Sequence, residues 1–134
     1  MVALAGARNT PEVIGPIRNF PIAAATTIYA GALVQLNAAG FLVPASATAA
    51  NIAVGRADET VVNAGEAGAA SVDVRRGIFR FANSAAGDLI ARSEIGKTVY
   101  VVDDQTVAKT NNAGARPAAG ICFDVDAQGV WVEF

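Results

Sequence analysis

The sequence contains no histidine and only one cysteine, Cys122. Histidine is the commonest general base near neutral pH and the commonest metal ligand. A chain without histidine and without a cluster of thiols has few ways to perform hydrolytic or metal-dependent chemistry. We therefore expect no catalytic residues, no metal site and no cofactor, and hence no enzyme.

Charge is also scarce, because charged residues make up 16% of the 134 residues and the formal net charge is −2, with a pI near 5.0. Nucleic-acid-binding proteins normally present a basic face. The one adjacent basic pair, Arg75-Arg76, is too small to form such a face. With Arg80 it could make a basic stripe, which we interpret as a solvated surface or a source of intersubunit salt bridges. We expect no nucleic-acid partner.

Long apolar runs are missing as well. No stretch approaches the roughly eighteen apolar residues of a membrane-spanning helix. The apolar opening at residues 1–7 has neither the length nor the preceding basic region of a signal peptide. The single cysteine cannot form an internal disulfide, and its apolar neighbours at 118–123 favour a buried, unreactive thiol. These features predict no membrane partner and fit synthesis in a reducing cytoplasm.

Small apolar side chains dominate what is present, since hydrophobic residues, mostly alanine and valine, reach 53%. From residue 22 onward, short β-branched or aromatic runs alternate with turn residues, which is typical of an all-β domain. We expect about eight to ten short strands in a small barrel or sandwich, forming one domain over residues 22–134. The expected strands lie at 28–29, 32–36, 41–44, 52–54, 71–75, 78–81, 99–102, 107–108, 119–125 and 130–134.

Some positions carry more specific expectations. The segment 37–40 predicts a hairpin turn with Gly40 at a positive φ, and Gly55 predicts a β-bulge. Val72 and Val74 alternate with charged residues. Because side chains alternate across a strand, these two valines are expected to share its buried face.

The first residues differ from the rest of the chain. Three prolines and two glycines in residues 1–21 disfavour a helix and a central strand. The larger apolar residues near the end of this stretch are Val13, Ile14, Ile17 and Phe20. Disordered tails are normally polar, so we expect an extended N-terminal arm over residues 1–21 with these four residues as partner contacts. The partner is either the chain's own barrel or a neighbouring subunit, and deletion of residues 1–19 is expected to leave the barrel folded.

One segment imitates a nucleotide-binding loop. Residues 91–98 satisfy a relaxed P-loop pattern, with alanine in place of the first glycine. A working P-loop needs a helix after it, so that helix amides face the phosphates, whereas 99–102 strongly favours a strand. We expect Ser93 to cap a single helical turn at 94–95, closed by Gly96, and we expect no nucleotide site.

Two pairs of carboxylates occur, Asp103-Asp104 and Asp124 with Asp126. Acid–base catalysis would require two carboxyl groups that converge on a cleft. Each pair lies at an expected hairpin turn, where aspartate accepts hydrogen bonds from local backbone amides. A calcium site is the alternative interpretation, although the spaced oxygen ligands of an EF-hand are missing. We interpret both pairs as turn residues.

A succession of strand-and-turn phrases runs from about residue 22 to the C-terminus. The phrases are 28–34 (IYAGALV), 37–45 (NAAGFLVPA), 54–57 (VGRA), 74–84 (VRRGIFRFANS), 95–104 (IGKTVYVVDD), 118–120 (AAG), 125–126 (VD) and 129–132 (GVWV). In this succession the chain resembles the capsid cement, or head decoration, proteins of tailed bacteriophages. The arm before residue 22 takes no part in the resemblance.

The resemblance implies a structural virion protein that binds the outside of a phage capsid shell, commonly as a homotrimer at three-fold and quasi-three-fold positions. Its partner would be the major capsid protein, and it would have no small-molecule substrate. It would stabilise the expanded shell against the pressure of packaged DNA, on the capsid exterior, after synthesis in the host cytoplasm. A cyclic trimer matches a three-fold site, and three linked weak contacts give an avidity that no single contact has.

Two other functions stay open from the sequence. One is another virion component, of the head or the tail, with a similar β fold. The other is a carbohydrate- or peptide-binding β module in which Trp131, Tyr29 or Tyr100 stacks on the ligand. That module requires Trp131 to lie exposed in a groove, whereas we expect Trp131 to be substantially buried as an anchor of the last strand.

Overall fold

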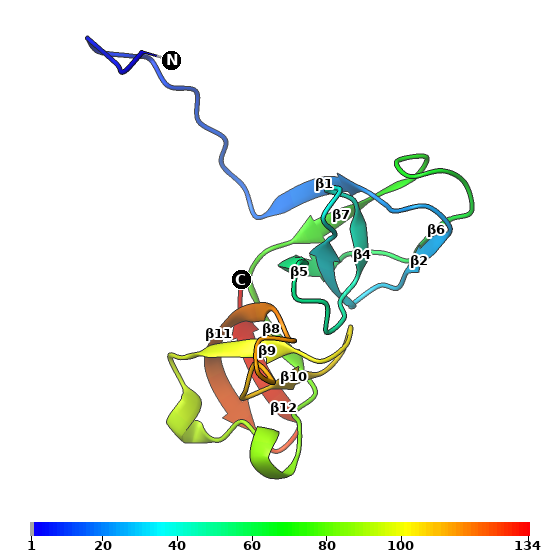
Figure 1. The fold of residues 1–134 in the computed structure, drawn as a ribbon, viewed down its shortest axis with the longest axis vertical. Helices are drawn as coiled ribbons and strands as arrows, with labels where there is room; N and C mark the ends of the chain where they lie inside the picture. Colours follow the sequence, from blue (N-terminus) through cyan, green and yellow to red (C-terminus); the bar gives the residue numbers. More distant parts are fainter. Residues whose placement is uncertain (1) are drawn as a thin grey trace.

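The computed structural model of the chain describes residues 2–134, and within them it contains twelve β-strands and two short 3₁₀ helices (Figure 1). The all-β class expected from the sequence is confirmed. Every pairing between these strands is antiparallel, and the strands form two five-stranded sheets and one two-stranded sheet. Neither short helix of residues 2–134 has the length and apolarity needed to span a bilayer.

The two large sheets follow one another along the chain (Figure 1). The first sheet has the strand order β1 (Ile17–Pro21), β7 (Ser71–Arg75), β5 (Ile52–Ala57), β3 (Leu33–Leu36), β4 (Leu42–Pro44). The second has the order β10 (Val107–Ala108), β9 (Thr98–Val101), β11 (Ala118–Asp126), β12 (Gly129–Glu133), β8 (Ile78–Phe81). The small sheet pairs β2 (Thr26–Ile28) with β6 (Val61–Asn63), and the 3₁₀ helices are η1 (Ala86–Asp88) and η2 (Arg92–Glu94).

Local sequence signals account for much of this arrangement. The turn after β3 contains Gly40 at φ 86°, and the Asn37 side chain accepts hydrogen bonds from the amides of residues 39 and 41. Gly55 lies at a break in register between β5 and β3, with φ 143°, as a bulge requires. A Cβ on Gly55 would collide with the carbonyl oxygen of Arg75 on β7, so the close approach of these strands also needs glycine.

Each large sheet has its own buried cluster. Val72 and Val74 are both buried on one face of β7, as their alternation predicts, and they belong to the cluster of the first sheet. Neighbouring residues on β3 divide between the two clusters, because Val34 belongs to the first and Leu33 to the second. Leu33 therefore ties the sheets together.

Two details differ from the sequence-based expectations. Twelve strands form among residues 2–134 where eight to ten were expected, because short pairings such as β6 carry too few residues to show a pattern. Ser93 does not cap a helical turn. It lies inside η2, whose N-cap is Ala91 without a side-chain hydrogen bond.

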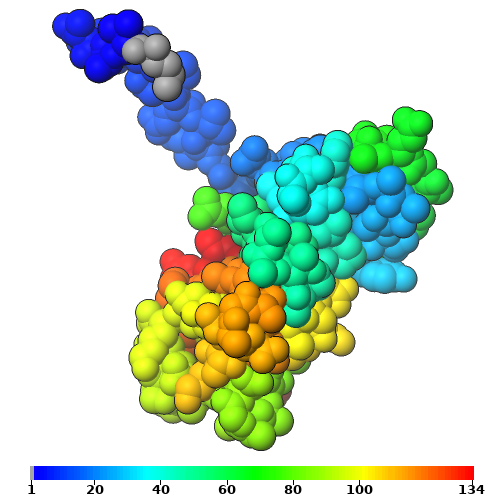
Figure 2. Space-filling model, in the orientation of Figure 1, coloured from blue at the N-terminus to red at the C-terminus, as the bar shows by residue number. Residues whose placement is uncertain are grey.

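The N-terminal stretch divides into two parts. Residues 17–21 form β1 and pair with β7 over their whole length, so they belong to the first sheet. Residues 2–16 leave the body as an extended tail with exposed side chains (Figures 1 and 2). A deletion of residues 1–19 would thus remove most of a paired strand, and a truncation that spares the sheet must end before Pro16, whose carbonyl accepts a hydrogen bond from the Arg76 amide.

Candidate functional site

The four apolar residues expected as partner contacts lie in different environments. Val13 is 98% exposed, Ile14 is 87% exposed and Ile17 is 45% exposed, so these three side chains face solvent in the single chain. Phe20 is 7% exposed and packs in the core of the first sheet, where the Arg18 guanidinium lies 4.7 Å from its ring centre. The arm also carries exposed Val2 and Leu4, at 97% and 72%.

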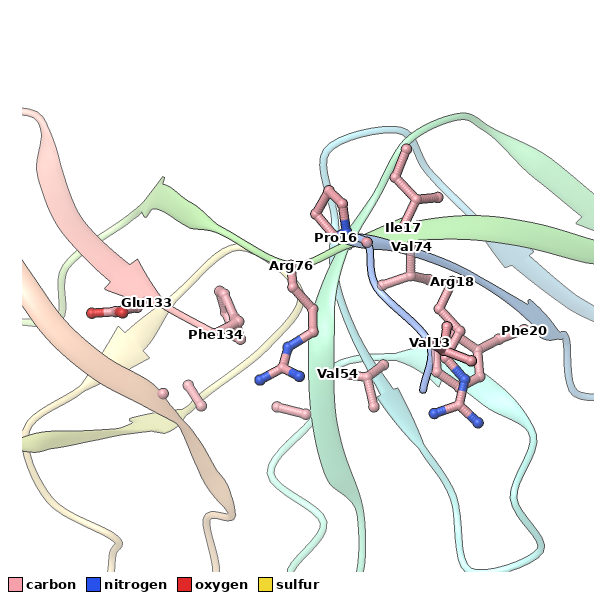
Figure 3. A pocket seen from close by; sticks show the side chains of 14 residues that line it. Val13, Pro16, Ile17, Arg18, Phe20, Val54, Val74, Arg76, Glu133 and Phe134 are labelled. Atoms are coloured by element: carbon pink, nitrogen blue, oxygen red, sulfur yellow. The ribbon is translucent and has the colours of Figure 1, made fainter. Parts of the chain in front are cut away.

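A groove of about 510 Å³ lies at the root of the arm, where the two large sheets meet (Figure 3). Its apolar lining comes from both sheets: Phe20, Val54 and Val74 belong to the first, and Phe134 follows the last strand of the second. Val13 and Pro16 of the arm also line it. The remaining lining residues are Gly15, Ile17, Arg18, Ala53, Arg76, Ala119, Gly120 and Glu133.

The groove carries charge on its walls. Arg18 and Arg76 stand on the side of the first sheet, and Glu133 stands on the side of the second (Figure 3). Within residues 2–134 none of the three forms an ion pair. An apolar floor with unpaired charges at its sides is the composition of a binding groove rather than of a packed core.

The sequence reasoning did not find this groove. Its lining comes from segments near residues 13–20, 53–54, 74–76, 119–120 and 133–134, which are far apart along the chain. A pattern within one strand cannot reveal which strands meet. Only the exposed apolar residues of the arm indicated this end of the molecule as a candidate for partner contacts.

The aromatic residues considered for ligand stacking do not form one platform. Trp131 is partly buried, its Nε1 donates a hydrogen bond to Asp126 at 2.8 Å, and the Arg80 guanidinium lies 5.6 Å from its ring centre. On β11, Asp124 is the neighbour of Trp131 and Ala118 is the neighbour of Tyr100. Six strand residues span roughly 20 Å, so Tyr100 and Trp131 are too far apart to share a ligand.

Tyr29, the third candidate for stacking, is exposed beside Asp104 and Gln105 at a shallow depression of about 340 Å³. This depression is formed by the segment after β2 and by the turn before β10, so it lies apart from Trp131 on β12. A single exposed tyrosine supplies one stacking surface only.

Asp103 and Asp104 lie in the turn before β10, whereas Asp124 and Asp126 lie in the last residues of β11, with Asp126 directly before the β11–β12 turn. Asp103 accepts a hydrogen bond from the amide of Gln105. Asp126 accepts bonds from two amides of the β11–β12 turn, and the Trp131 hydrogen bond is the main cause that lowers the pKa of Asp126. Asp124 accepts from the amide of Val125 and lies 3.7 Å from an Arg92 nitrogen. Among residues 2–134 no three acidic or cysteine side chains gather as a metal-binding group.

The P-loop-like segment has the geometry of a strand connection. η2 covers three residues and is followed by Thr98–Val101, which forms β9. The strand expected after this segment is therefore confirmed. With no helix beginning there, helix amides are not directed at a phosphate.

The arginines of the supposed basic stripe are separated. Arg75 lies on β7, in the first sheet, and shares Asp58 with Arg56, at 3.4 Å and 2.7 Å. Arg80 lies on β8, in the second sheet. The Arg56 hydrogen bond is the main reason that the pKa of Asp58 falls below its usual value, and the Arg56 guanidinium also lies 4.5 Å from the Phe79 ring centre on β8. This cluster joins the two sheets.

Cys122 is buried in the core of the second sheet, as its apolar neighbours predict. Burial raises the pKa of the thiol, and the nearby carboxylates of Asp124 and Glu94 raise it further. The thiolate, which is the reactive form, is thus disfavoured near neutral pH.

Residues 2–16 and the adjoining groove are therefore the best candidate for the functional surface, since they combine exposed apolar side chains with an unfilled apolar cleft. Comparisons of the chain with protein-family models, with curated proteins and with solved structures found no match.

Proposed function

We propose that this chain is a structural virion protein that binds the outer surface of a tailed-bacteriophage capsid. It acts as a homotrimer at three-fold and quasi-three-fold positions of the major capsid protein lattice, and it stabilises the shell against the pressure of packaged DNA. The proposal starts from the resemblance of residues 22–134 to capsid cement proteins. The observation that carries it is the N-terminal arm, which holds exposed apolar side chains outside the folded body.

The energetics of such an arm favour repeated weak contacts. Full burial of a valine, leucine or isoleucine side chain contributes about 1.5–3 kcal/mol. Ordering the backbone of an extended segment costs about 1–2 kcal/mol for each residue, so one arm alone gives a weak contact. Three arms in a trimer bind together, because the first contact raises the effective concentration of the others. A lattice of identical subunits offers the repeated binding sites that such a trimer needs.

The carbohydrate-binding alternative gains no support from the aromatic residues. Trp131 is partly covered by its own neighbours, and Tyr100 and Trp131 are too far apart for a common ligand. The second alternative, another head or tail component, differs from a cement protein in its location on the particle. Cryo-electron microscopy of the virion separates these two, because a cement protein gives extra density over the local three-fold axes.

The direct test is binding of the purified chain to expanded capsids that lack it. The full chain is expected to co-sediment with these capsids and to raise the temperature at which they release DNA. A variant without residues 2–15 keeps β1 and both cores, so it is expected to stay folded and to bind at least tenfold more weakly. A full chain that neither co-sediments with the capsids nor protects them would refute the proposed function. Absence of the polypeptide from purified virions would also refute the proposed function.

A further inference from the structure

The groove at the root of the arm is not filled by the arm of the same chain. Val13 and Pro16 stand along its wall, and the residues before them lead away from the body (Figures 2 and 3). Its floor, which includes Val54 and Val74, remains open. The volume of about 510 Å³ falls in the range of roughly 300–1,000 Å³ that is usual for ligand sites. The groove is therefore large enough for side chains from another segment.

The tip of the arm has the pattern of a segment that binds such a groove. Side chains alternate sides along an extended chain, so Val2 and Leu4 face one side, up to the bend of the chain at Gly6. The opposite side of this part of the tip carries only alanine, at positions 3 and 5. The tip thus offers one apolar edge, and Val2 and Leu4 on that edge are almost fully exposed in the single chain.

One charge of the arm has an opposite charge on the groove wall, which also carries Arg18 and Arg76. Arg8 lies four residues beyond Leu4, and a tip that straightened at Gly6 on binding would carry it roughly 13 Å along the chain on the same side. Glu133 stands on the groove wall at the side of the second sheet (Figure 3). Within residues 2–134 of one copy, neither Arg8 nor Glu133 forms an ion pair. With Leu4 on the apolar floor, an Arg8–Glu133 ion pair is the polar contact that binding of the tip requires.

The arm is long enough to reach a second molecule. An extended segment over residues 2–15 spans up to roughly 45 Å. A compact body of residues 17–134 has a radius of gyration of about 13 Å, and so a diameter of about 35 Å. The tip can therefore cross the face of an adjacent copy.

We propose that the groove binds the arm tip, Val2–Leu4, of a second copy of this chain. Each copy then gives its arm to one neighbour and receives an arm from another. Such a head-to-tail contact closes into a ring when the rotation between copies permits it, as in a cyclic trimer. The inference goes beyond capsid binding, since it assigns only the tip, Val2–Leu4, to a second copy and leaves Ile14 and Ile17 as capsid contacts. Its test contains no capsid.

The test uses two variants of the full chain with one added cysteine each, Leu4→Cys and Val54→Cys. They are mixed in equal amounts and oxidised mildly, and 4–54 disulfides are identified by mass spectrometry of the digested protein. In such a mixture a 4–54 bond can form only between two molecules. We expect it at a yield at least tenfold above that of a control mixture of Leu4→Cys with Ala127→Cys, in which the second site lies on the exposed β11–β12 turn. Cys122 is buried and is common to all samples.

Two outcomes overturn the inference. A second sample is the dilute double variant Leu4→Cys/Val54→Cys, in which a 4–54 bond can form within one molecule. A 4–54 bond that forms in this double variant but not in the mixture means that the arm fills its own groove. A yield equal to the control in both samples means that the groove takes another occupant, such as a capsid segment. Neither outcome affects the co-sedimentation of the chain with capsids, so the failure of this inference can be told apart from the failure of the proposed function.

Charge substitution on the arm gives an independent test. The substituted residues lie outside both buried clusters, so the folded body is not disturbed. The variant Val2→Asp/Leu4→Asp is expected to lose self-association in sedimentation velocity, with at least a tenfold rise in the dissociation constant. The matched control Ala3→Asp/Ala5→Asp places the same charges on the opposite side of the same tip. It is expected to change the dissociation constant less than threefold. Equal behaviour of the two variants, or a full chain that stays monomeric, contradicts the inference.

Discussion

Leu33 is the side chain through which the two sheets are expected to stabilise one another. It is fully buried, and although it lies on β3 of the first sheet it packs in the core of the second. Its amide donates a hydrogen bond to Asp104 at 2.8 Å, and its carbonyl accepts one from Ala45 at 2.9 Å. Because the backbone is fixed on both sides, the surroundings cannot easily move into the space that a smaller side chain would leave.

The substitution Leu33→Ala is therefore expected to cost about 3–4.5 kcal/mol of unfolding free energy, from lost burial together with the remaining cavity. With an unfolding entropy of about 2.1 cal/mol/K for each residue, the melting temperature should fall by roughly 10–15 °C. Urea unfolding, followed by circular dichroism and by the fluorescence of the single tryptophan, measures the change at fixed protein concentration. Leu89→Ala, at a 48% exposed position, is the control and should cost less than about 1 kcal/mol. Equal costs for the two variants would refute this account of the sheet junction.

Three further predictions concern single positions. Gly120→Ala should destabilise the fold by about 2 kcal/mol or more in urea unfolding, because a Cβ there would collide with a carbonyl oxygen of β12, whereas Gly87→Ala has open space and should change little. The hydrogen bond from Arg56 lowers the pKa of Asp58 in the folded state, so this carboxylate stabilises the fold above its ordinary pKa of 3.8 and loses that effect as the pH falls through the lowered value. Between about pH 5 and pH 2 the unfolding free energy of Asp58→Asn should fall less steeply than that of the unsubstituted chain, and parallel curves would contradict this. Cys122 should react with a thiol reagent at least a hundredfold more slowly in the native protein than in urea, and rapid native labelling would show that the core is open.

The strands that the sequence predicted best are those with a strong local signal. Alternation in β7 placed Val72 and Val74 on the buried face, and the turn before Phe41 required the positive φ of Gly40. These features depend on neighbours within a few residues. A pattern of that kind is readable without knowledge of the partner strand.

The pairing of distant strands was not predictable in the same way. Proline at 16 and 21 argued for an arm up to residue 21, yet residues 17–21 pair with residues of β7 that lie fifty or more positions away in the sequence. Proline is tolerated there because β1 is an edge strand. The groove depends on the meeting of two sheets, so no local pattern contained it. The exposed apolar arm was the part of the candidate site that composition could indicate.

The two buried clusters draw on different parts of the chain, and this has a consequence for folding during synthesis. Every described residue of the first cluster lies between Phe20 and Val74, whereas the second cluster needs Leu33 and Ala45 from the first half. On the ribosome the N-terminal half emerges first, with all of its own interior available. The C-terminal half then folds against a first sheet that can already be formed. It cannot complete its own buried cluster without Leu33 and Ala45 of the N-terminal half.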